Sequence, residues 1–156
     1  MSQRAAWQLE RLGFGEVYDF VAGKSYWIAS ARPTIRTTGA ARVSDKMRTD
    51  PATARPDETV GAARTRSGGR VDEDAVDVVV VNEHDIVVGV ARAASLATAD
   101  PEDPLGTIMS VGPTTVRPDE PVENLQARMG AKSVRSIIVT KPTGELVGVY
   151  QSTTSA

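Results

Sequence analysis

The sequence predicts an α/β fold made of two copies of one small unit, preceded by a short N-terminal α/β segment. The first observation is an internal repeat: residues 49–60 return as residues 111–122, with seven identities in twelve positions at an offset of 62. The second is that each copy leads into an unbroken run of β-branched residues followed by an apolar Gly-Val segment. A repeat of this kind indicates duplicated structural units that stack to complete a shared core.

Composition places the chain among globular proteins. Its 156 residues are enough for one domain, or for two small units with a common core. The 40% hydrophobic and 24% charged contents are ordinary for a folded chain. No apolar run reaches the roughly 18 residues of a membrane span, and no secretory leader is seen, so we expect a cytoplasmic protein without a membrane partner.

Cysteine is absent and His84 is the single histidine. Disulfides, thiolate metal sites, a cysteine nucleophile and multi-histidine metal sites are therefore excluded. We interpret His84 as an exposed turn residue.

The charges are distributed unevenly along the chain. Residues 1–70 carry 12 Lys and Arg against 7 Asp and Glu, whereas residues 71–156 carry 6 against 13. The pI of about 5.4 argues against general nucleic-acid binding. The basic half could attract a phosphate-bearing ligand or could face the acidic half.

The N-terminal segment predicts a helix over residues 2–12, capped by Ser2 and ended by Gly13. A short strand over residues 17–21 and a helical piece around residues 26–28 follow. Residues 4–14, residues 17–23 and Trp27 resemble the last third of a rhodanese (sulfurtransferase) domain. That family needs a catalytic cysteine just before this helix. We therefore interpret residues 1–30 as a rhodanese-like C-terminal fragment, a fusion remnant or truncated portion that carries no sulfurtransferase activity.

Residues 31–42 are expected to form a linker, because they combine Arg, Pro, Thr and Gly without apolar periodicity. The next residues predict one helical turn capped by Ser44, and residues 105–109 hold the same place before the second copy. Met47 and Met109 keep the 62-residue offset and are expected to fill core space.

Each copy then predicts the same order of elements. A short extended segment, residues 52–55 or 114–117, is pushed toward β backbone by the proline after it. A helix follows, and acids favour its first turn. The expected caps are Asp57 or Glu58 in the first copy and Asp119 or Glu120 in the second, with Pro121 tolerated in the first turn.

The two predicted helices differ in how regular their apolar pattern is. Val122, Leu125 and Met129 form an apolar stripe in the second copy. In the first copy, Val60 and Ala63 are followed by arginines and glycines, so that helix should be short and residues 67–74 should form an exposed loop.

The apolar runs after these helices predict strands buried on both faces, and a turn joins each run to a second hairpin strand, now at an offset of 59. The predicted strands are residues 78–81 and 137–139, paired with residues 86–90 and 145–149. A helix over residues 91–99 follows the first copy only, and residues 100–104 link the copies. Because the second copy has no matching helix, apolar surface would stay uncovered, and a homodimer is expected.

This doubled order of elements, over about residues 42–152, resembles a tandem pair of CBS domains, with repeat 1 at residues 43–99 and repeat 2 at residues 105–152. The resemblance implies β-α-β-β-α repeats packed around a pseudo-twofold axis, a regulatory rather than catalytic role, and frequent dimerisation. It also implies adenosine-containing ligands, such as AMP, ATP or S-adenosylmethionine, in clefts between the repeats, with no cofactor required.

The family's ligand motif follows the hairpin glycine as Gly-h-h-Thr-x-x-Asp, where Thr holds phosphate and Asp holds the ribose hydroxyls. In the first copy, Arg92 and Ser95 stand in the Thr and Asp places. In the second copy, Gln151 and Thr154 stand there. The resemblance thus implies that Arg92 could hold phosphate as a charge, while Ser95 or Thr154 could make a weaker ribose contact.

Further candidates lie beside the shared cleft. The repeated threonines and the small residues after them would line a base pocket, and two polar residues stand just before the buried strands. These candidates are Thr53, Ala54, Thr115, Val116, Asp77 and Ser136. For the threonines, β-propensity and turn bonding is an equally good explanation, and for Asp77 a solvated strand start.

Two functions remain open from the sequence. The first is a non-enzymatic regulatory module that senses an adenosyl nucleotide or a similar small anionic ligand. The alternative is a degenerate pair acting as a ligand-free dimerisation or interaction scaffold, which the missing ribose carboxylates favour.

Overall fold

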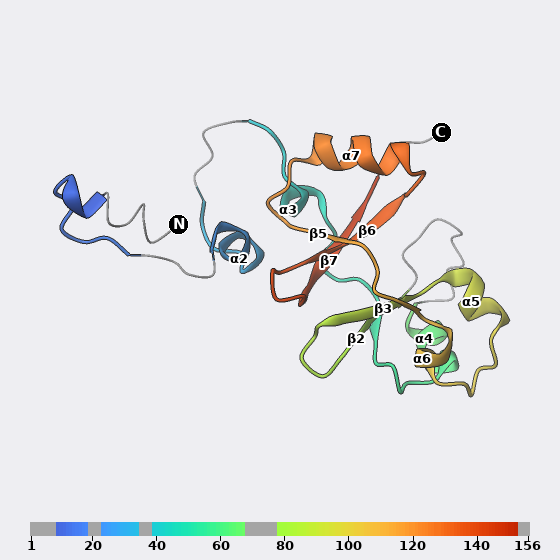
Figure 1. Cartoon of the computed structure of the whole chain (residues 1–156). Coiled ribbons are helices and arrows are strands. Elements are labelled where there is room, and N and C mark those ends of the chain that lie inside the picture. The colour runs from blue at the N-terminus through green and yellow to red at the C-terminus, as the bar shows by residue number, and fades with distance from the viewer. Residues whose placement is uncertain (1–8, 19–22, 35–38, 68–77, 153–156) are drawn as a thin grey trace.

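Two small α/β lobes make up most of the molecule (Figure 1). The computed structural model describes residues 9–18, 23–34, 39–67 and 78–152. One lobe holds a four-stranded sheet and the other a three-stranded sheet, as the duplicated sequence predicts. The predicted α/β class and its two-repeat organisation are confirmed.

The first lobe is built on a sheet of order β1-β2-β3-β4. Its strands and helices are β1 (Thr53–Ala54), α4 (Val60–Arg66), β2 (Val78–Val81), β3 (Val87–Ala91), α5 (Ala93–Thr98), α6 (Leu105–Ile108) and β4 (Ser110–Val111). β1 is parallel to β2, and the other two pairings are antiparallel. The short α4 agrees with its weak apolar pattern, and the loop expected after it lies mostly outside the described residues.

The second lobe repeats this plan with a sheet of order β5-β6-β7. Its elements are α3 (Val43–Lys46), β5 (Thr115–Val116), α7 (Val122–Ala131), β6 (Ser136–Thr140) and β7 (Leu146–Gln151). The predicted stripe on α7 is confirmed, because Val122, Leu125 and Met129 are all buried.

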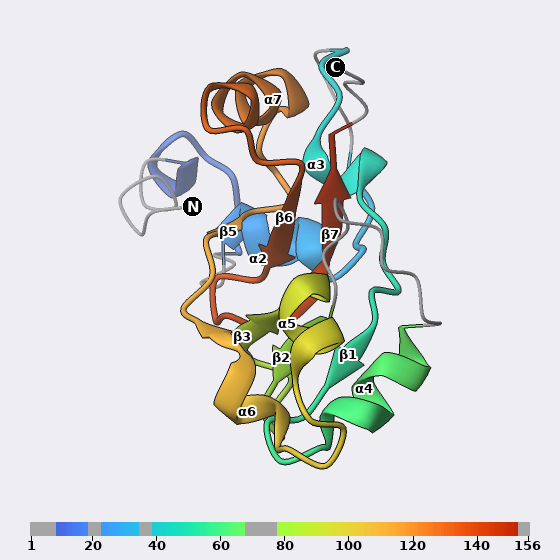
Figure 2. The same ribbon diagram turned by 90° about the vertical axis from the view of Figure 1, so that its right-hand side faces the viewer.

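The helical turn before each repeat packs on the other repeat (Figure 2). Val43, at the start of α3, donates its backbone N–H to the Glu120 carbonyl at 3.0 Å and joins the core of the second lobe. Leu105, at the start of α6, donates to the Glu58 carbonyl at 2.8 Å and joins the core of the first lobe. The two repeats therefore exchange their leading turns and cannot complete their cores separately.

Alternation along the central strands divides the interior into three apolar clusters. Val78 and Val80 of β2 face the helices of their own lobe. Val79 and Val81 instead meet Ile138 and Val149 of the other sheet. Since both faces of β2 are covered, its four valines are all buried. The prediction of strands buried on both faces is confirmed.

The two hairpin turns also pair with each other. Val87 donates to the Gly144 carbonyl at 3.1 Å, and Leu146 donates to the Asp85 carbonyl at 3.0 Å. Asp85 and Gly144 stand at the 59-residue offset and share a positive φ, 58° and 93°. The two hairpin turns are thus equivalent in backbone conformation as well as in position.

The helices begin later than the acidic residues suggest. Thr59 caps α4 through its side chain, which accepts from Ala62 N–H, and Pro121 is the N-cap of α7. The expected capping by Asp57 or Glu58, and by Asp119 or Glu120, is therefore wrong. Instead, Glu58 and Glu120 form ion pairs with arginines in the last turns of the same helices, Arg66 and Arg128.

The cap of α3 differs from the expected one in a similar way. Arg42, not Ser44, is the N-cap residue. The Asp45 side chain accepts the Arg42 backbone N–H at 2.8 Å, because an acid three positions after the cap can reach back to it.

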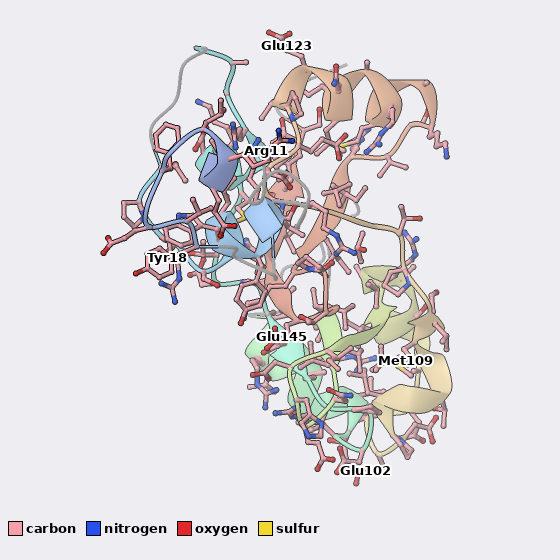
Figure 3. All side chains as sticks on the ribbon, turned by 60° about the vertical axis from the view of Figure 1, so that its left-hand side comes forward. Arg11, Tyr18, Glu102, Met109, Glu123 and Glu145 are labelled. Carbon is pink, nitrogen blue, oxygen red and sulfur yellow. The ribbon has the colours of Figure 1, made fainter. Side chains whose placement is uncertain are left out.

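The N-terminal segment is only partly as expected. Residues 9–11 are helical and Gly13 follows with a φ of 91°, and α2 (Gly23–Ala29) confirms the helical piece. Val17 and Tyr18 are not in a strand, and the rest of that expected strand lies outside the described residues. Tyr18 is 83% exposed and lies at the edge of the molecule, whereas Met109 lies inside a lobe (Figure 3). In α2, Ser25 Oγ donates to Asp119 Oδ1 at 2.7 Å, so this helix docks on the second repeat.

Within the described ranges, no helix has the length and apolar character needed to cross a membrane.

Candidate functional site

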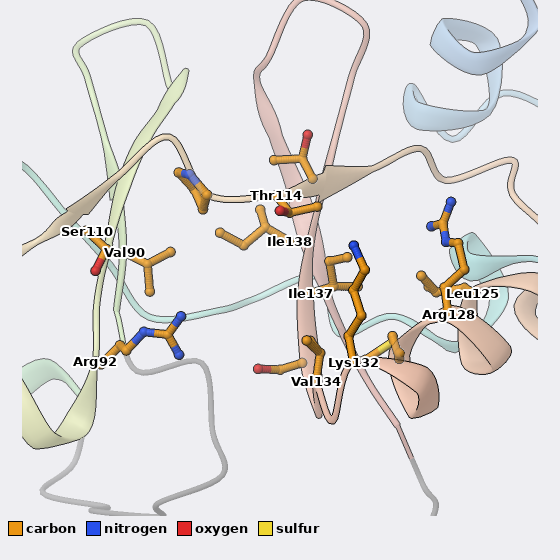
Figure 4. Close-up of a pocket in the computed structure, with 14 residues that line it drawn as sticks. Val90, Arg92, Ser110, Thr114, Leu125, Arg128, Lys132, Val134, Ile137 and Ile138 are labelled. Atoms are coloured by element: carbon orange, nitrogen blue, oxygen red, sulfur yellow. The ribbon is translucent and has the colours of Figure 1, made fainter.

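A cavity of about 410 Å³ lies between the two repeats (Figure 4). This volume falls within the roughly 300–1,000 Å³ of small-molecule sites. Its walls combine apolar side chains, hydroxyls and cations: Val90, Leu125, Met129, Val134, Ile137, Ile138 and Pro113; Ser110, Thr114, Thr115 and Ser136; Arg92, Arg128 and Lys132. A site of this size, with an apolar floor and a few polar groups, suits a small molecule that has both apolar and polar parts.

Residues from both repeats form the walls of the cavity, because β4, which precedes the second repeat, pairs with β3 of the first repeat. Val90 and Arg92 come from the end of β3, and Ser110 comes from β4, which pairs with β3. From the second repeat, α7 supplies Arg128 and β6 supplies Ser136. A ligand in this cavity would therefore touch both repeats at once.

Three cations line the cavity, and the fourteen lining residues that belong to the described parts of the chain include no Asp or Glu. Arg92 is the N-cap residue of α5 and its exposed side chain makes no cap hydrogen bond. Lys132 directly follows α7 and is exposed. In the described part of the chain, neither side chain is held by a hydrogen bond or an ion pair. Both positive charges are thus available to an anion.

Arg128 differs from these two because it already has a partner. Its Nη2 lies 2.9 Å from Glu120 Oε1 and 3.2 Å from Oε2. The Arg128 side chain is 57% exposed and that of Glu120 20%. The pair is therefore only partly exposed to solvent, with its carboxylate on the more buried side.

Three of the residues that the sequence singles out meet in this cavity: Arg92, Thr115 and Ser136. Arg92 reaches in from the first repeat, and the other two lie on adjacent strands of the second. Their hydroxyls supply both donors and acceptors beside the apolar floor.

The other predicted residues lie elsewhere. Ala54 and Val116 are buried in the two helix-facing cores and do not line the cavity, because alternation turns their side chains toward α4 and α7. Ser95 is half-buried within α5, and Gln151 is exposed at the end of β7. Asp77 and Thr154 lie outside the described residues.

Thr53 occupies the position equivalent to Thr115, but its surroundings differ. Arg66 Nη1 donates to the Thr53 carbonyl at 2.7 Å, and Arg66 Nη2 lies 2.7 Å from Glu58 Oε2. The hydrogen bond from Arg66 holds the pKa of Glu58 below its usual value, and that of Arg66 is raised by the same bond. The pair Arg66–Glu58 thus repeats Arg128–Glu120 at the 62-residue offset, but ties its arginine to the backbone of β1.

Sequence reasoning missed Arg128 and Lys132. They stand at i and i+4, next to the buried Leu125 and Met129, so they project beside the apolar stripe of the same helix. The sequence shows their spacing. It does not show which side of α7 faces the first repeat, because that depends on how α3 and α6 pack on the opposite repeats.

A metal site is not supported in the part of the chain that the structure describes, where no three His, Cys, Asp or Glu residues cluster. His84 is exposed in its turn, as expected, with Glu83 as its neighbour.

Comparison with known proteins identifies the fold. Residues 105–150 match the CBS domain family. Solved CBS domains of a transcriptional regulator from Streptococcus pneumoniae superpose with a TM-score of 0.62, at 21% identity over 71% of this chain and 92% of theirs. The fold is that of a CBS domain pair.

Two further similar structures are complexes with ligands. The CBS domain pair of protein MJ0100, in complex with 5-methylthioadenosine and S-adenosyl-L-methionine, has a TM-score of 0.61 at 22% identity, over 72% of this chain and 90% of that one. The cytosolic domain of the Mg²⁺ channel MgtE, in complex with ATP, has a TM-score of 0.61 at 24% identity, over 70% of this chain and 45% of that one. A search of curated proteins finds no match. The CBS family match lies outside residues 1–30, where the rhodanese resemblance was drawn.

Proposed function

We propose that this chain is a non-enzymatic regulatory module that senses an adenosyl nucleotide or a similar small anionic ligand in the cleft between its two CBS repeats. The observation that carries the proposal is the cavity of about 410 Å³, which residues of both repeats line and to which the described part of the chain contributes three cations. Similar CBS structures described as complexes with adenosyl compounds support it.

Sensing follows from the position of the cavity. Arg92 belongs to the first repeat, whereas Thr115, Ser136 and Arg128 belong to the second. A ligand that contacts both sets favours the arrangement of repeats in which all contacts are made. Binding would in this way stabilise one relative position of the repeats, which a partner domain could read.

The proposal assigns binding roles to three polar lining residues and to the apolar floor. Arg92 holds a phosphate as a charge, the hydroxyls of Thr115 and Ser136 bond polar groups of the ligand, and the apolar floor receives a base. We propose binding rather than catalysis, because the CBS domain family, which residues 105–150 match, is generally regulatory.

The alternative function is a ligand-free dimerisation or interaction scaffold. One observation favours it: Ser95, in the place of the family's ribose-binding acid, does not line the cavity. The homodimer, the cytoplasmic location, the repeat boundaries 43–99 and 105–152, and the rhodanese-like nature of residues 1–30 are likewise proposals.

A thermal-shift titration separates the two functions. AMP, ATP and S-adenosylmethionine should be tested at millimolar levels, because a ligand that binds only the folded state raises the melting temperature. A rise with any of the three supports sensing. No rise with any of them, together with a stable dimer in light scattering, would replace the sensor by the scaffold.

A further inference from the structure

The helix α2 contacts the second repeat at the carboxyl ends of β5 and β6 (Figures 1 and 2). Asp119 stands three residues after β5, and Lys141 directly follows β6. Ser25 Oγ donates to Asp119 Oδ1 at 2.7 Å, and Lys141 Nζ lies 5.5 Å from the centre of the Tyr26 ring. An ammonium group within about 6 Å of an aromatic ring is attracted by it. Two points on the second repeat thus hold neighbouring residues of α2.

The helical form of α2 does not come from a place in a core. None of its seven residues is buried. Its C-terminal end is closed locally, because Ala31 has a φ of 53° and the Arg32 N–H donates to the Trp27 carbonyl at 3.2 Å. A helix of this length is much shorter than the roughly 12 residues below which isolated helices are marginal in water. We therefore expect α2 to depend on its contacts with the second repeat.

The equivalent turn of the first repeat differs at both contact points. Asp57, at the 62-residue offset from Asp119, is exposed, whereas Asp119 is half-buried. Asn82 stands where the second repeat has Lys141, at the 59-residue offset of the hairpins, and its side-chain oxygen accepts two backbone N–H groups of its own turn. An amide has no positive charge to place over an aromatic ring. Of these two turns, that of the second repeat is thus the one that offers an acceptor and a cation together.

We infer that Asp119 and Lys141 form an interaction surface of the second repeat whose occupant is α2, and that α2 leaves this surface without unfolding of either lobe. This inference goes beyond the proposed function and does not depend on a ligand in the cavity. Among the described residues, the three apolar clusters include none from α2, so its release removes no contact from them. The chain that precedes α2 is held against the second repeat when α2 is docked and is let go when α2 is released.

Amide hydrogen exchange of the full chain, followed by NMR, measures this release. The N–H groups of Ser30, Ala31 and Arg32 donate to carbonyls of α2, so they are protected while the helix is formed. Their exchange rate reports the released population. In the wild-type chain they should exchange faster than the amides of Val79 and Val139, which lie in the buried central strands and open with the lobes.

Asp119→Ala tests the first contact, because it removes the acceptor of Ser25 without altering α2 itself. The α2 amides should exchange about two- to tenfold faster, the range that follows from the loss of one hydrogen bond. The matched control is Asp57→Ala, the same substitution in the equivalent turn of the first repeat. It should leave the exchange of α2 unchanged.

Lys141→Gln tests the second contact. The α2 amides should exchange about two- to fivefold faster, as expected for the loss of an exposed cation–π contact. The Lys141 ammonium also lies 3.1 Å from Glu145 Oε2, so Glu145→Gln is the control for the ion pair. This control keeps the cation beside Tyr26 and should not speed the exchange of α2.

Three outcomes would overturn the inference. Equal exchange of α2 in Asp119→Ala and Asp57→Ala would show that Asp119 does not hold the helix. Exchange of the wild-type α2 amides as slow as that of Val79 and Val139 would show that α2 opens only with the lobes. An equal loss of protection at Val79 in Asp119→Ala, with a lower melting temperature, would show general destabilisation in place of local release.

Discussion

Arg48 and Val149 exchange two backbone hydrogen bonds across the repeats. Arg48 N–H donates to the Val149 carbonyl at 2.8 Å, and Val149 N–H donates to the Arg48 carbonyl at 2.9 Å. At the equivalent place, Ser110 pairs with Val90 between β4 and β3. The segment before each repeat is thereby bonded to the last strand of the other, and β4 brings Ser110 to the cavity.

The close approach of these segments explains the glycine in each hairpin. A Cβ on Gly148 would collide with the Arg48 carbonyl, and one on Gly89 would lie 2.6 Å from Met109 Sδ. We expect Gly148→Ala to lower the free energy of unfolding by about 1–3 kcal/mol, as overpacking does. Urea unfolding with a two-state fit measures this.

The control is Gly130→Ala in α7. A Cβ there meets nothing within 4 Å, so the substitution should be neutral or stabilise the fold by up to about 1 kcal/mol. Equal effects of both substitutions would show that the contact between Gly148 and Arg48 is not tight.

Arg117 and Arg55 hold equivalent positions but are not equally satisfied. Arg117 Nη1 donates to the Thr140 hydroxyl and to the Lys141 carbonyl. Arg55 Nη1 is buried without an acceptor among the described residues, because Val81 stands where the second repeat has Thr140.

Single substitutions at Val81 and at Thr140 test this difference between the two arginines. Val81→Thr gives Arg55 an acceptor, so it should stabilise the fold by up to about 1 kcal/mol, whereas Thr140→Val should destabilise it by about 0.5–1.5 kcal/mol. Chemical denaturation of both variants provides the comparison. A loss of stability in Val81→Thr as large as in Thr140→Val would refute this explanation.

Glu58 should make stability depend on pH. The hydrogen bond from Arg66 holds the pKa of Glu58 below its usual value, so the folded state favours the ionised form. The contribution is fully present above the unfolded pKa of about 4.3 and is lost as pH falls through the lower, folded pKa. Wild type should therefore be more stable than Glu58→Gln near neutral pH, and the difference should shrink in acid.

Melting temperatures of wild type, Glu58→Gln and the exposed-site control Glu102→Gln, measured from about pH 3 to pH 7, test this. The control should run parallel to wild type. A difference between wild type and Glu58→Gln that is constant over this range would contradict the assigned role of Glu58.

The repeat and its apolar patterns were enough to predict the architecture. Val78 to Val81 indicated a strand covered on both faces, and the structure shows the two lobes doing this. The sequence alone could not predict that α3 and α6 each pack on the opposite repeat, because this packing depends on contacts between residues far apart in the chain. The prediction that Asp57 or Glu58 caps α4 is wrong, because an acid before a helix can serve either as a cap or in an ion pair, and Glu58 pairs with Arg66.

The same exchange limits what could be predicted of the site. Arg92, Thr115 and Ser136 follow from local position and do meet in one cavity. Arg128 and Lys132 carry no signal of their own in the sequence, and only the placement of the first repeat against α7 makes them part of the cavity wall. Local sequence thus predicts which strands border the cleft, while the cations of the facing helix depend on tertiary packing.

Chemical-shift mapping of AMP on the isotopically labelled chain tests the central claim most directly. We expect saturable shifts of backbone amides on both sides of the cavity, at Val90 and Arg92 in the first repeat and at Thr115 and Ser136 in the second. Shifts confined to residues away from these strands, or none at millimolar AMP, would contradict the claim that the cleft between the repeats is a ligand site.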